Sequence, residues 1–491
     1  MSRGPNTRFA DLFALTGWSK GELARLVNRR GAVAGQQQLS TDTSRVRRWI
    51  ERGEIPRDPV PRILAALFSE QLGRVVTPED LGLTRGRAPG DPANEPAEDA
   101  SWPQPERTAA VLTEFTGMDL MLNRRGLMGA STALVAGAAI AGPINDWMTS
   151  SASAASRPLS RSAGSAVRDA VPALDYYEGG PVGEEEVHSL EASVDIFRAW
   201  DASRGGGLQR KAVVGQLNEV SGMLAYRHPA HLERRLWTVA ANLAVLAGWM
   251  SHDVGLEPTA QKYFVMAVHA AREAGDRPRA GEALSRAARQ MVHLGRPADA
   301  LDLMRVADAR SGPENLPRTR AMLRTVEAWA HASLGHSQAT RRTLGEAEEL
   351  FAKDTGEQGP SWLQFFDEAD LHGMQALTYR TLAEHDPGAA GLAQQHARVA
   401  LKLREGGRER SMLFDQLSMA SACFLANEPG EARRYAQMAL SQIGEMSSHR
   451  TWDRLRQMYR LSSRYENVAE VSELRAQIRS TMPAKPRPQI V

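Results

Sequence analysis

A repeated helical pattern between residues 184 and 477 constrains the fold of this chain more than any other sequence feature. Apolar residues recur there at helical spacing, and no sustained alternation of apolar and polar residues indicates a strand. Gly255, Gly295 and Gly335 are spaced forty residues apart, and the last two each follow a leucine at a predicted turn. We therefore predict an all-α fold that contains repeated pairs of helices.

Glycine is expected to close the first helix of each pair, and the alanines that follow let the next helix approach closely. Further copies are predicted near Gly388 and Gly430. This pattern is typical of a tetratricopeptide-like (TPR-like) array in degenerate form. We assign residues 184–480 to a TPR-like α-solenoid and 481–491 to a tail. An ordinary bundle of alanine-rich helices is the alternative.

Arrays of this kind present a concave surface that binds peptides, protein partners or small ligands. The stretch "SWLQFF" places Trp362, Phe365 and Phe366 at helical spacing, and these are the candidate partner-binding residues. The same spacing is typical of side chains that face a core. A peptide or protein partner on the array is therefore a prediction, with core packing as the alternative.

Residues 1–85 form a separate unit in which four short helices are predicted. The second of them begins with a capping box, in which Ser19 is followed three residues later by Glu22. In the third, "TDTSRVRRWIERG", Val46, Trp49 and Ile50 lie at i, i+3 and i+4 and must face the core. The remaining side chains of that helix are driven outward: Ser44, Arg45, Arg47, Arg48 and Arg52.

The same region carries a positive charge. Residues 1–90 contain fifteen Arg or Lys and nine Asp or Glu, whereas the whole chain has a formal charge of only +2. Nearly all the cations of the chain are arginines, so arginine content alone is weak support for nucleic-acid binding. The chain is also too long for one core, so several folding units are expected.

Four helices with a basic third helix are the layout of a helix-turn-helix DNA-binding domain, whose third helix enters the major groove. Base edges in the major groove and phosphate oxygens both offer hydrogen-bond acceptors to such side chains. On this interpretation the residues that read bases are Thr43, Ser44, Arg45 and Arg47. The residues that contact phosphates are Arg48 and Lys20. The alternative is that the arginines form a solvated helix face and bind nothing.

The stretches "SKGELA", "VRRWIERGEIP" and "TPEDLGL" resemble the lambda-repressor-type (XRE) family of regulators. The N-terminal stretches from "GWSKGELARLVNRR" to "LFSEQLGRVVTPEDLGL", with "NRRGLMG" and "PSWLQFFDEADLHGMQAL", are similar to actinobacterial regulators of the negative-regulator-of-streptomycete-development type, which join such a domain to a TPR region. The resemblance implies a lambda-repressor-like domain and a repressor that affects differentiation, sporulation and antibiotic production.

One departure from the XRE pattern lies between the second and third helices, where about a dozen extra residues, "NRRGAVAGQQQL", replace a short turn. This insertion either lengthens the second helix and adds phosphate contacts from Arg29, Arg30 or Gln36 to Gln38, or is an inert loop, and we favour the inert loop slightly. Which residues read bases depends on how the insertion places the third helix.

Residues 86–183 are predicted to form a linker region, because "GRAPGDPANEPAEDASWPQP" and "TSSASAASRPLSRSAGSA" are too polar or proline-rich to hold a core. Between them lies a helical and apolar segment, 106–147. It contains "NRRGLMGASTALVAGAAIAGP", which reads like a twin-arginine export signal but starts far from the N-terminus. Its apolar part, 127–141, is too short to span a membrane. We expect a cytoplasmic, nucleoid-associated protein without membrane contact.

No catalytic chemistry is recognisable. The chain has no phosphate-binding P-loop, no H-E-x-x-H and no cysteine pair, and its single Cys423 is expected to be a buried thiol. We therefore expect no enzyme, no cofactor and no metal site. The expected partners are double-stranded DNA and a second copy of the chain in a homodimer. The alternative is an interaction scaffold whose N-terminal domain has lost DNA affinity.

Overall fold

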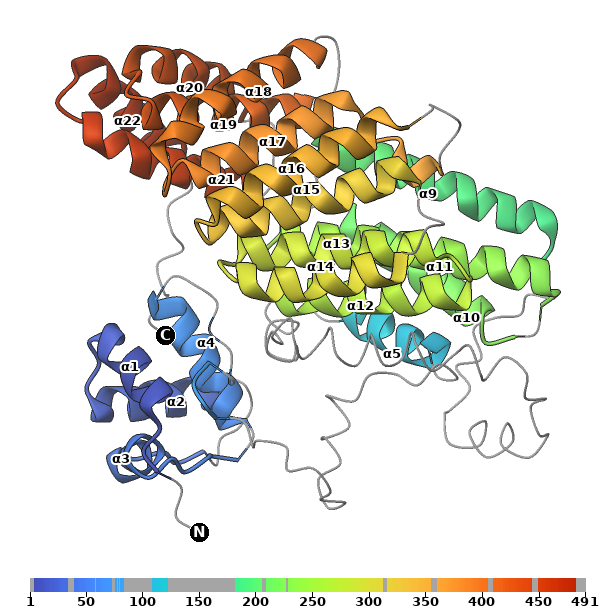
Figure 1. The fold of residues 1–491 in the computed structure, drawn as a ribbon. Helices are drawn as coiled ribbons and strands as arrows, with labels where there is room; N and C mark the ends of the chain where they lie inside the picture. Colours follow the sequence, from blue (N-terminus) through green and yellow to red (C-terminus); the bar gives the residue numbers. More distant parts are fainter. Residues whose placement is uncertain are drawn as a thin grey trace.

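The computed structural model describes residues 4–33, 39–57, 59–72, 76, 78, 80–83, 108–121, 182–204, 209–226, 228–311, 316–354, 360–404, 409–443 and 449–482. All regular elements within these ranges are helices (Figure 1). The prediction of an all-α chain is therefore confirmed for the described residues.

The N-terminal domain consists of α1 (Thr7–Thr16), α2 (Lys20–Val33), α3 (Thr43–Glu51) and α4 (Val60–Leu72). Its apolar core includes Phe9, Leu23 and Phe68 together with Val46 and Trp49 from α3. The backbone N–H of Glu22 donates a hydrogen bond to Ser19 Oγ over 3.1 Å, which satisfies one free amide at the start of α2. Four helices thus share one core, as the spacing of the apolar residues predicts.

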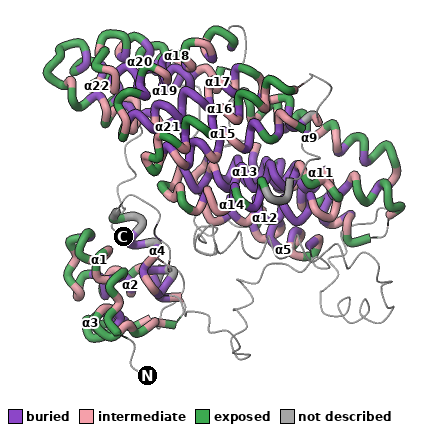
Figure 2. Tube along the Cα trace, in the orientation of Figure 1, coloured by how far each residue is buried: buried purple, intermediate pink, exposed green. Residues whose placement is uncertain are grey.

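The C-terminal part is a stack of helices that we call the helical array. Its elements are α9 (Glu184–Arg204), α10 (Arg210–Met223), α11 (Ala230–Asp253), α12 (Glu257–Glu273), α13 (Arg277–His293), α14 (Pro297–Ser311), α15 (Pro317–Ser333), α16 (Ser337–Ala352), η3 (Ser361–Leu363), α17 (Glu368–Leu382), η4 (Pro387–Ala389), α18 (Ala390–Leu403), α19 (Glu409–Leu425), α20 (Pro429–Ile443), α21 (His449–Leu461), η5 (Ser462–Tyr465) and α22 (Ala469–Thr481). From α10 to α20 each helix packs against the next, and each odd-numbered helix from α11 to α19 also contacts the following odd-numbered helix. Figure 2 shows that the buried residues concentrate where these helices face one another.

Left-handed glycines end several helices of the array, as predicted. The predicted Gly255, Gly295 and Gly335 follow α11, α13 and α15 with φ of 75°, 72° and 73°, and Gly275, which was not predicted, follows α12 with φ of 73°. The expectation fails for the later copies, because Gly388 lies within η4 and Gly430 within α20. After α19 the left-handed residue is Asn427, with φ of 61°. Asparagine tolerates this conformation better than other residues with a side chain, so it takes the place of glycine there.

Two helices from the beginning of the array also contact two helices from near its end. Helix α21 contacts α11, and α19 contacts α9. The carboxylate of Asp253, at the end of α11, accepts hydrogen bonds from Arg410 of α19 and Arg450 of α21. Arg410 also donates to the backbone oxygen of Asp201 in α9 over 2.7 Å. Ion pairs buried in the interior therefore join the first helices of the array to the last.

Helix α5 (Thr108–Met121) belongs to the array rather than to a separate spacer. Its Leu112 and Phe115 are buried in the same core as α10 to α13. Asp119 is also buried, forms an ion pair with Arg210, and accepts a hydrogen bond from Tyr263 Oη over 2.6 Å. The predicted linker region therefore contains a helix whose apolar side chains are part of the array core. The twin-arginine-like stretch and the apolar segment 127–141 lie outside the described residues.

An ion pair between Asp80 and Arg296 joins the N-terminal domain to the array, and Arg296 also pairs with Asp299. Arg296 is the residue between Gly295 and α14, so the pair lies at a turn of the array. Across the described ranges, none of the helices combines the length and apolar character required to cross a bilayer.

Candidate nucleic-acid interface

Helix α3 has one buried and one exposed face. The Asp42 carboxylate caps its N-terminus by accepting the backbone N–H of Arg45 over 2.8 Å. Val46 and Trp49 are 0% and 4% exposed and anchor the helix in the domain core. The other face is open to solvent and carries all the predicted base-reading residues, together with one predicted phosphate contact: Thr43, Ser44, Arg45, Arg47 and Arg48. The structure thus brings these predicted residues together on one surface.

The residues that lead into α3 are held in place by α2. The side chain of Asn28 donates from Nδ2 to the backbone oxygen of Thr41 over 2.8 Å, and its Oδ1 accepts the backbone N–H of Thr41 over 2.6 Å. A Cβ on Gly31 would lie 2.8 Å from Leu39 Cδ2, so the side chain of Leu39 packs closely against α2 at this glycine. The insertion therefore begins as the last turns of α2, which runs to Val33, and these contacts hold the residues just before α3 against that helix. Among the predicted insertion contacts, Arg29 is exposed, whereas Gln36 to Gln38 lie outside the described residues.

Two carboxylates share the basic surface. Glu51 accepts Lys20 Nζ over 2.9 Å and Arg47 Nε over 2.7 Å, and Glu54 pairs with Arg48 Nε over 2.9 Å. Hydrogen bonds from Arg47 and then Lys20 lower the pKa of Glu51, so this carboxyl is ionised at neutral pH. All five side chains are at least 39% exposed. Because exposed pairs contribute little to stability, a phosphate can replace Glu51 or Glu54 at small cost.

Arg45 differs from its neighbours. It is exposed, and in the parts of the chain that the structure describes its guanidinium forms neither a hydrogen bond nor an ion pair. A guanidinium in this state offers its full set of donors to an incoming acceptor. Arg45 is therefore the residue of α3 that is best prepared to contact a base edge or a phosphate.

The sequence reasoning overlooked the two acidic residues of the interface. Glu51 lies four residues after Arg47 on the same helix, a spacing that brings opposite charges together. That pair could have been recognised from the sequence. The contact between Lys20 and Glu51 could not, because it joins two different helices 31 residues apart.

The candidate partner-binding aromatics mostly lie inside the array. Trp362 and Phe366 are each 2% exposed, and the half-buried Phe365 packs against the same core. The guanidinium of Arg279 lies 4.7 Å from the centre of the Trp362 ring, and Phe351 meets Phe366 edge to face. Trp362 and Phe366 therefore act as core residues and present no surface to a partner.

Cys423 is buried, as predicted, and is 1% exposed. Burial raises the pKa of its thiol to about 11, and Gln394 Nε2 approaches the sulfur at 3.4 Å. A thiol in this environment is uncharged at neutral pH and packs as a small apolar group.

A protein-family model described as the SP15 N-terminal domain matches residues 9–84. The match covers α2 to α4 and all but the first two residues of α1, and it ends close to the boundary expected at residue 85. Neither the curated proteins nor the solved structures yield a match to this chain.

Proposed function

We propose that the protein is a DNA-binding transcriptional regulator whose N-terminal domain is a lambda-repressor-like helix-turn-helix unit of the XRE type. Helices α2 and α3 would be its two central helices, and α3 would enter the major groove. The observation that carries this proposal is the exposed face of α3, where Arg45 has no protein partner among the described residues and Arg47 and Arg48 flank it.

The side chains divide into two groups on this proposal. Thr43, Ser44, Arg45 and Arg47 point away from the core and would contact base edges, because arginine bonds guanine and hydroxyl groups accept or donate to several bases. Arg48 and Lys20 would hold phosphates after exchanging Glu54 and Glu51 for the DNA backbone. The first group would set sequence preference and the second would set overall affinity.

The helical array would be a TPR-like region that dimerises the regulator or receives a peptide or protein partner. The pairwise stacking of its helices and the left-handed glycines at its turns support this assignment. By resemblance to regulators of streptomycete development, we propose that the protein acts in the cytoplasm as a repressor of differentiation and secondary metabolism. We propose no catalytic activity.

The proposal is tested by selecting genomic fragments with the purified full-length protein and with its Arg45→Ala variant. Arg342→Ala, which removes an equally charged side chain that is 72% exposed on α16, is the matched control. We expect discrete enriched sites for the parent and the control, and loss of the enriched sequence for Arg45→Ala. Equal enrichment of all fragments by the three proteins would refute base reading by α3.

A specific observation favours a second candidate function. Glu51 and Glu54 pair with Lys20, Arg47 and Arg48 and offset two of their three positive charges, which a domain that no longer binds DNA tolerates. The protein would then be an interaction scaffold whose N-terminal domain serves only for docking. No retention of any DNA by the folded parent at physiological salt, together with partner capture through the array, would support this candidate.

A further inference from the structure

The turn between α13 and α14 reaches beyond the helical array. Gly295 follows α13 in the left-handed conformation, and the backbone N–H of Arg296 donates to the backbone oxygen of Met291 over 2.8 Å, which fixes Arg296 at the end of the helix. Both Nη atoms of the Arg296 guanidinium then donate to the carboxylate of Asp80 in the N-terminal domain, Nη2 over 3.4 Å. A forked contact of this kind fixes the relative direction of the two groups as well as their distance.

The residues at the same place in the other turns stay within the array. Leu256 is buried, and Asp276 caps α13. His336 lies with its Nδ1 atom 3.4 Å from Nδ1 of His331 in α15. Among the described residues that directly follow a left-handed glycine of the array, Arg296 is therefore the one that contacts the N-terminal domain.

The ion pair between Asp80 and Arg296 joins two separate cores. The described core of the N-terminal domain and the described cores of the array share no residue. Among the described helices, α1 to α4 pack against one another, and none of them packs extensively against a helix of the array. Domains that meet without a large apolar interface are free to move relative to one another.

Asp299 lets the contact open without leaving a buried charge unpaired. The Nε atom of Arg296 donates to Asp299 in the first turn of α14, and the side chains of Arg296 and Asp299 are 12% and 14% exposed. Asp80 is 31% exposed. When Asp80 leaves, the guanidinium keeps one carboxylate partner and Asp80 becomes hydrated. Release therefore avoids the large penalty that follows when one partner of a buried pair is removed.

Inside the N-terminal domain, the segment that carries Asp80 is tied to α3. Leu81 is 0% exposed in the domain core. The Nδ2 atom of Asn6 donates to the backbone oxygens of Leu81 and Gly82 over 2.8 and 3.2 Å. The backbone N–H of Asn6 donates to the backbone oxygen of Ile50 in α3 over 2.8 Å. One residue, Asn6, therefore connects the segment held by the array to the end of the proposed recognition helix.

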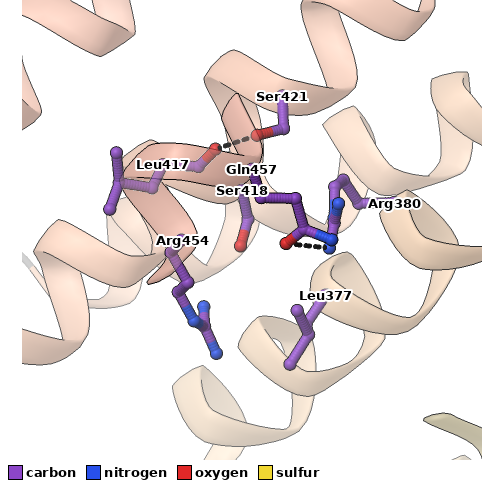
Figure 3. Close-up of a pocket in the computed structure, with 7 residues that line it drawn as sticks. All are labelled: Leu377, Arg380, Leu417, Ser418, Ser421, Arg454 and Gln457. Atoms are coloured by element: carbon purple, nitrogen blue, oxygen red, sulfur yellow. Dashed lines mark hydrogen bonds between the residues drawn. The ribbon is translucent and has the colours of Figure 1, made fainter. Parts of the chain in front are cut away.

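A recess between α17, α19 and α21 offers the array no site for a small ligand (Figure 3). It has room for about 10 Å³, which is the space of roughly one water molecule. Arg380 and Gln457, which both line it, are already joined by a hydrogen bond of 2.8 Å. The contact at Arg296 is therefore the stronger indication of how the array affects another part of the chain.

We propose that the turn at Arg296 is a reversible docking site for the N-terminal domain, so that the array sets the direction in which α3 faces. The array holds the domain through Asp80, and release of Asp80 lets the domain change its direction relative to the array. Only the consequence for DNA rests on the proposed function, because a docked domain presents α3 to DNA in one direction. The docking itself requires no DNA.

The test measures the distance between α3 and the array in the full-length protein, without DNA. Single-molecule energy transfer between two dyes reports this distance and its spread. One dye is attached at Arg52→Cys, an exposed position directly after α3, and the other at Arg342→Cys, which is 72% exposed on α16. The native Cys423 is 1% exposed and is not labelled in the folded protein, so the dyes occupy the two chosen positions.

Three substitutions in the labelled protein separate the roles of the charges. Asp80→Asn and Arg296→Gln each remove one partner of the docking pair. We expect a narrow distance distribution for the parent at low salt and a wider one for these two variants, whose equilibrium constant for docking should fall about fivefold or more. Asp299→Asn is the matched control, because it removes a neighbouring carboxylate and leaves the docking pair in place. It should favour docking, since Arg296 then depends on Asp80 for a carboxylate partner.

Two further measurements sharpen the test. The double variant Asp80→Asn with Arg296→Gln should release the domain no further than either single variant, because both substitutions remove the same contact. Added salt should widen the distribution of the parent, because it screens a partly exposed ion pair, and should leave that of Asp80→Asn unchanged.

Two results would overturn the proposal. The first is a distribution that is the same for the parent, Asp80→Asn and Arg296→Gln, whether narrow or wide. The second is release of the domain by Asp299→Asn to the same extent as by Asp80→Asn, which would show that Arg296 does not hold Asp80 by itself. If a variant does not fold, the parent decides alone, and a distribution that salt leaves unchanged refutes reversible docking. These results do not bear on DNA binding, which the selection of genomic fragments tests separately.

Discussion

Arg450 donates to the carboxylate of Asp253, which lies 197 residues earlier in the chain. Arg410 binds the other oxygen of the same carboxylate, whose side chain is 0% exposed. The two arginines lower the pKa of Asp253 despite the opposing effect of burial, so the carboxyl is ionised at neutral pH. One buried charge thus holds α11 to both α19 and α21.

We predict that Asp253→Asn destabilises the protein by about 3–5 kcal/mol, because it leaves two buried guanidiniums with an incomplete partner. Chemical denaturation followed by circular dichroism measures the loss. Asp195→Asn, which changes a carboxylate that is 64% exposed on α9, should cost less than about 0.5 kcal/mol. A similar, small loss for both variants would contradict the role assigned to Asp253.

Arg45 and Lys20 should affect DNA binding in different ways. Replacing Arg45 by Ala should remove about 1–3 kcal/mol of discrimination between an enriched site and random DNA, as expected for the loss of a base contact. Replacing Lys20 by Ala should weaken binding to both DNAs equally and reduce the salt slope by about one. Fluorescence anisotropy titrations at several salt concentrations measure both quantities. Identical profiles for the two variants would rule out the division of roles.

Glu51 forms ion pairs with both Lys20 and Arg47 and so competes with DNA phosphates for these two cations. We predict that Glu51→Gln raises the affinity for random and enriched DNA alike. The slope of log Kobs against log salt should become more negative by about 0.9 for each additional phosphate that the variant neutralises. Glu349→Gln on α16 removes an exposed carboxylate far along the chain and serves as the control. No increase in affinity would indicate that Lys20 and Arg47 do not reach the DNA.

His269 makes the stability of the array depend on pH. Burial, with a smaller effect of Arg272, lowers the pKa of this histidine to about 3, compared with 6.5 in an unfolded chain. Below pH 6.5 the unfolded state therefore binds a proton that the folded state does not. The unfolding free energy decreases as the pH is lowered, until the pKa of the folded state is reached. Above pH 6.5 the group has no effect on the slope.

We predict that His269→Gln removes this dependence. Relative to the variant, the parent should lose about 2 kcal/mol of unfolding free energy between pH 7 and pH 5. Denaturant titrations at each pH measure the unfolding free energy of both proteins. Comparing its change between pH 7 and pH 5 cancels any effect of the substitution that does not depend on pH. His188→Gln, at a side chain that is 82% exposed, should leave the slope unchanged. Parallel pH profiles for the parent and His269→Gln would exclude the assigned pKa.

Local sequence patterns predicted the elements well. The spacing of Val46 and Trp49 identified the buried face of α3, and the forty-residue spacing of Gly255, Gly295 and Gly335 identified turns that the structure contains. These predictions succeed because helix caps and apolar faces depend on residues within a few positions of one another.

Contacts between distant segments were not predictable. Asp253 and Arg450 are ordinary polar residues in their own helices, and only the stacking of the intervening helices brings them together. The burial of Trp362 depends in the same way on Arg279 from α13. The docking of α5 through Asp119 was missed because a single buried carboxylate leaves no periodic signal.

Asn28 of α2 forms hydrogen bonds with both the backbone N–H and the backbone oxygen of Thr41, two residues before α3. Because Thr41 is anchored to Asn28 of α2, the start of α3 is held against the domain two residues before its first turn. For the experimenter, Asn28 is therefore a residue to keep unchanged in variants that test the exposed face of α3.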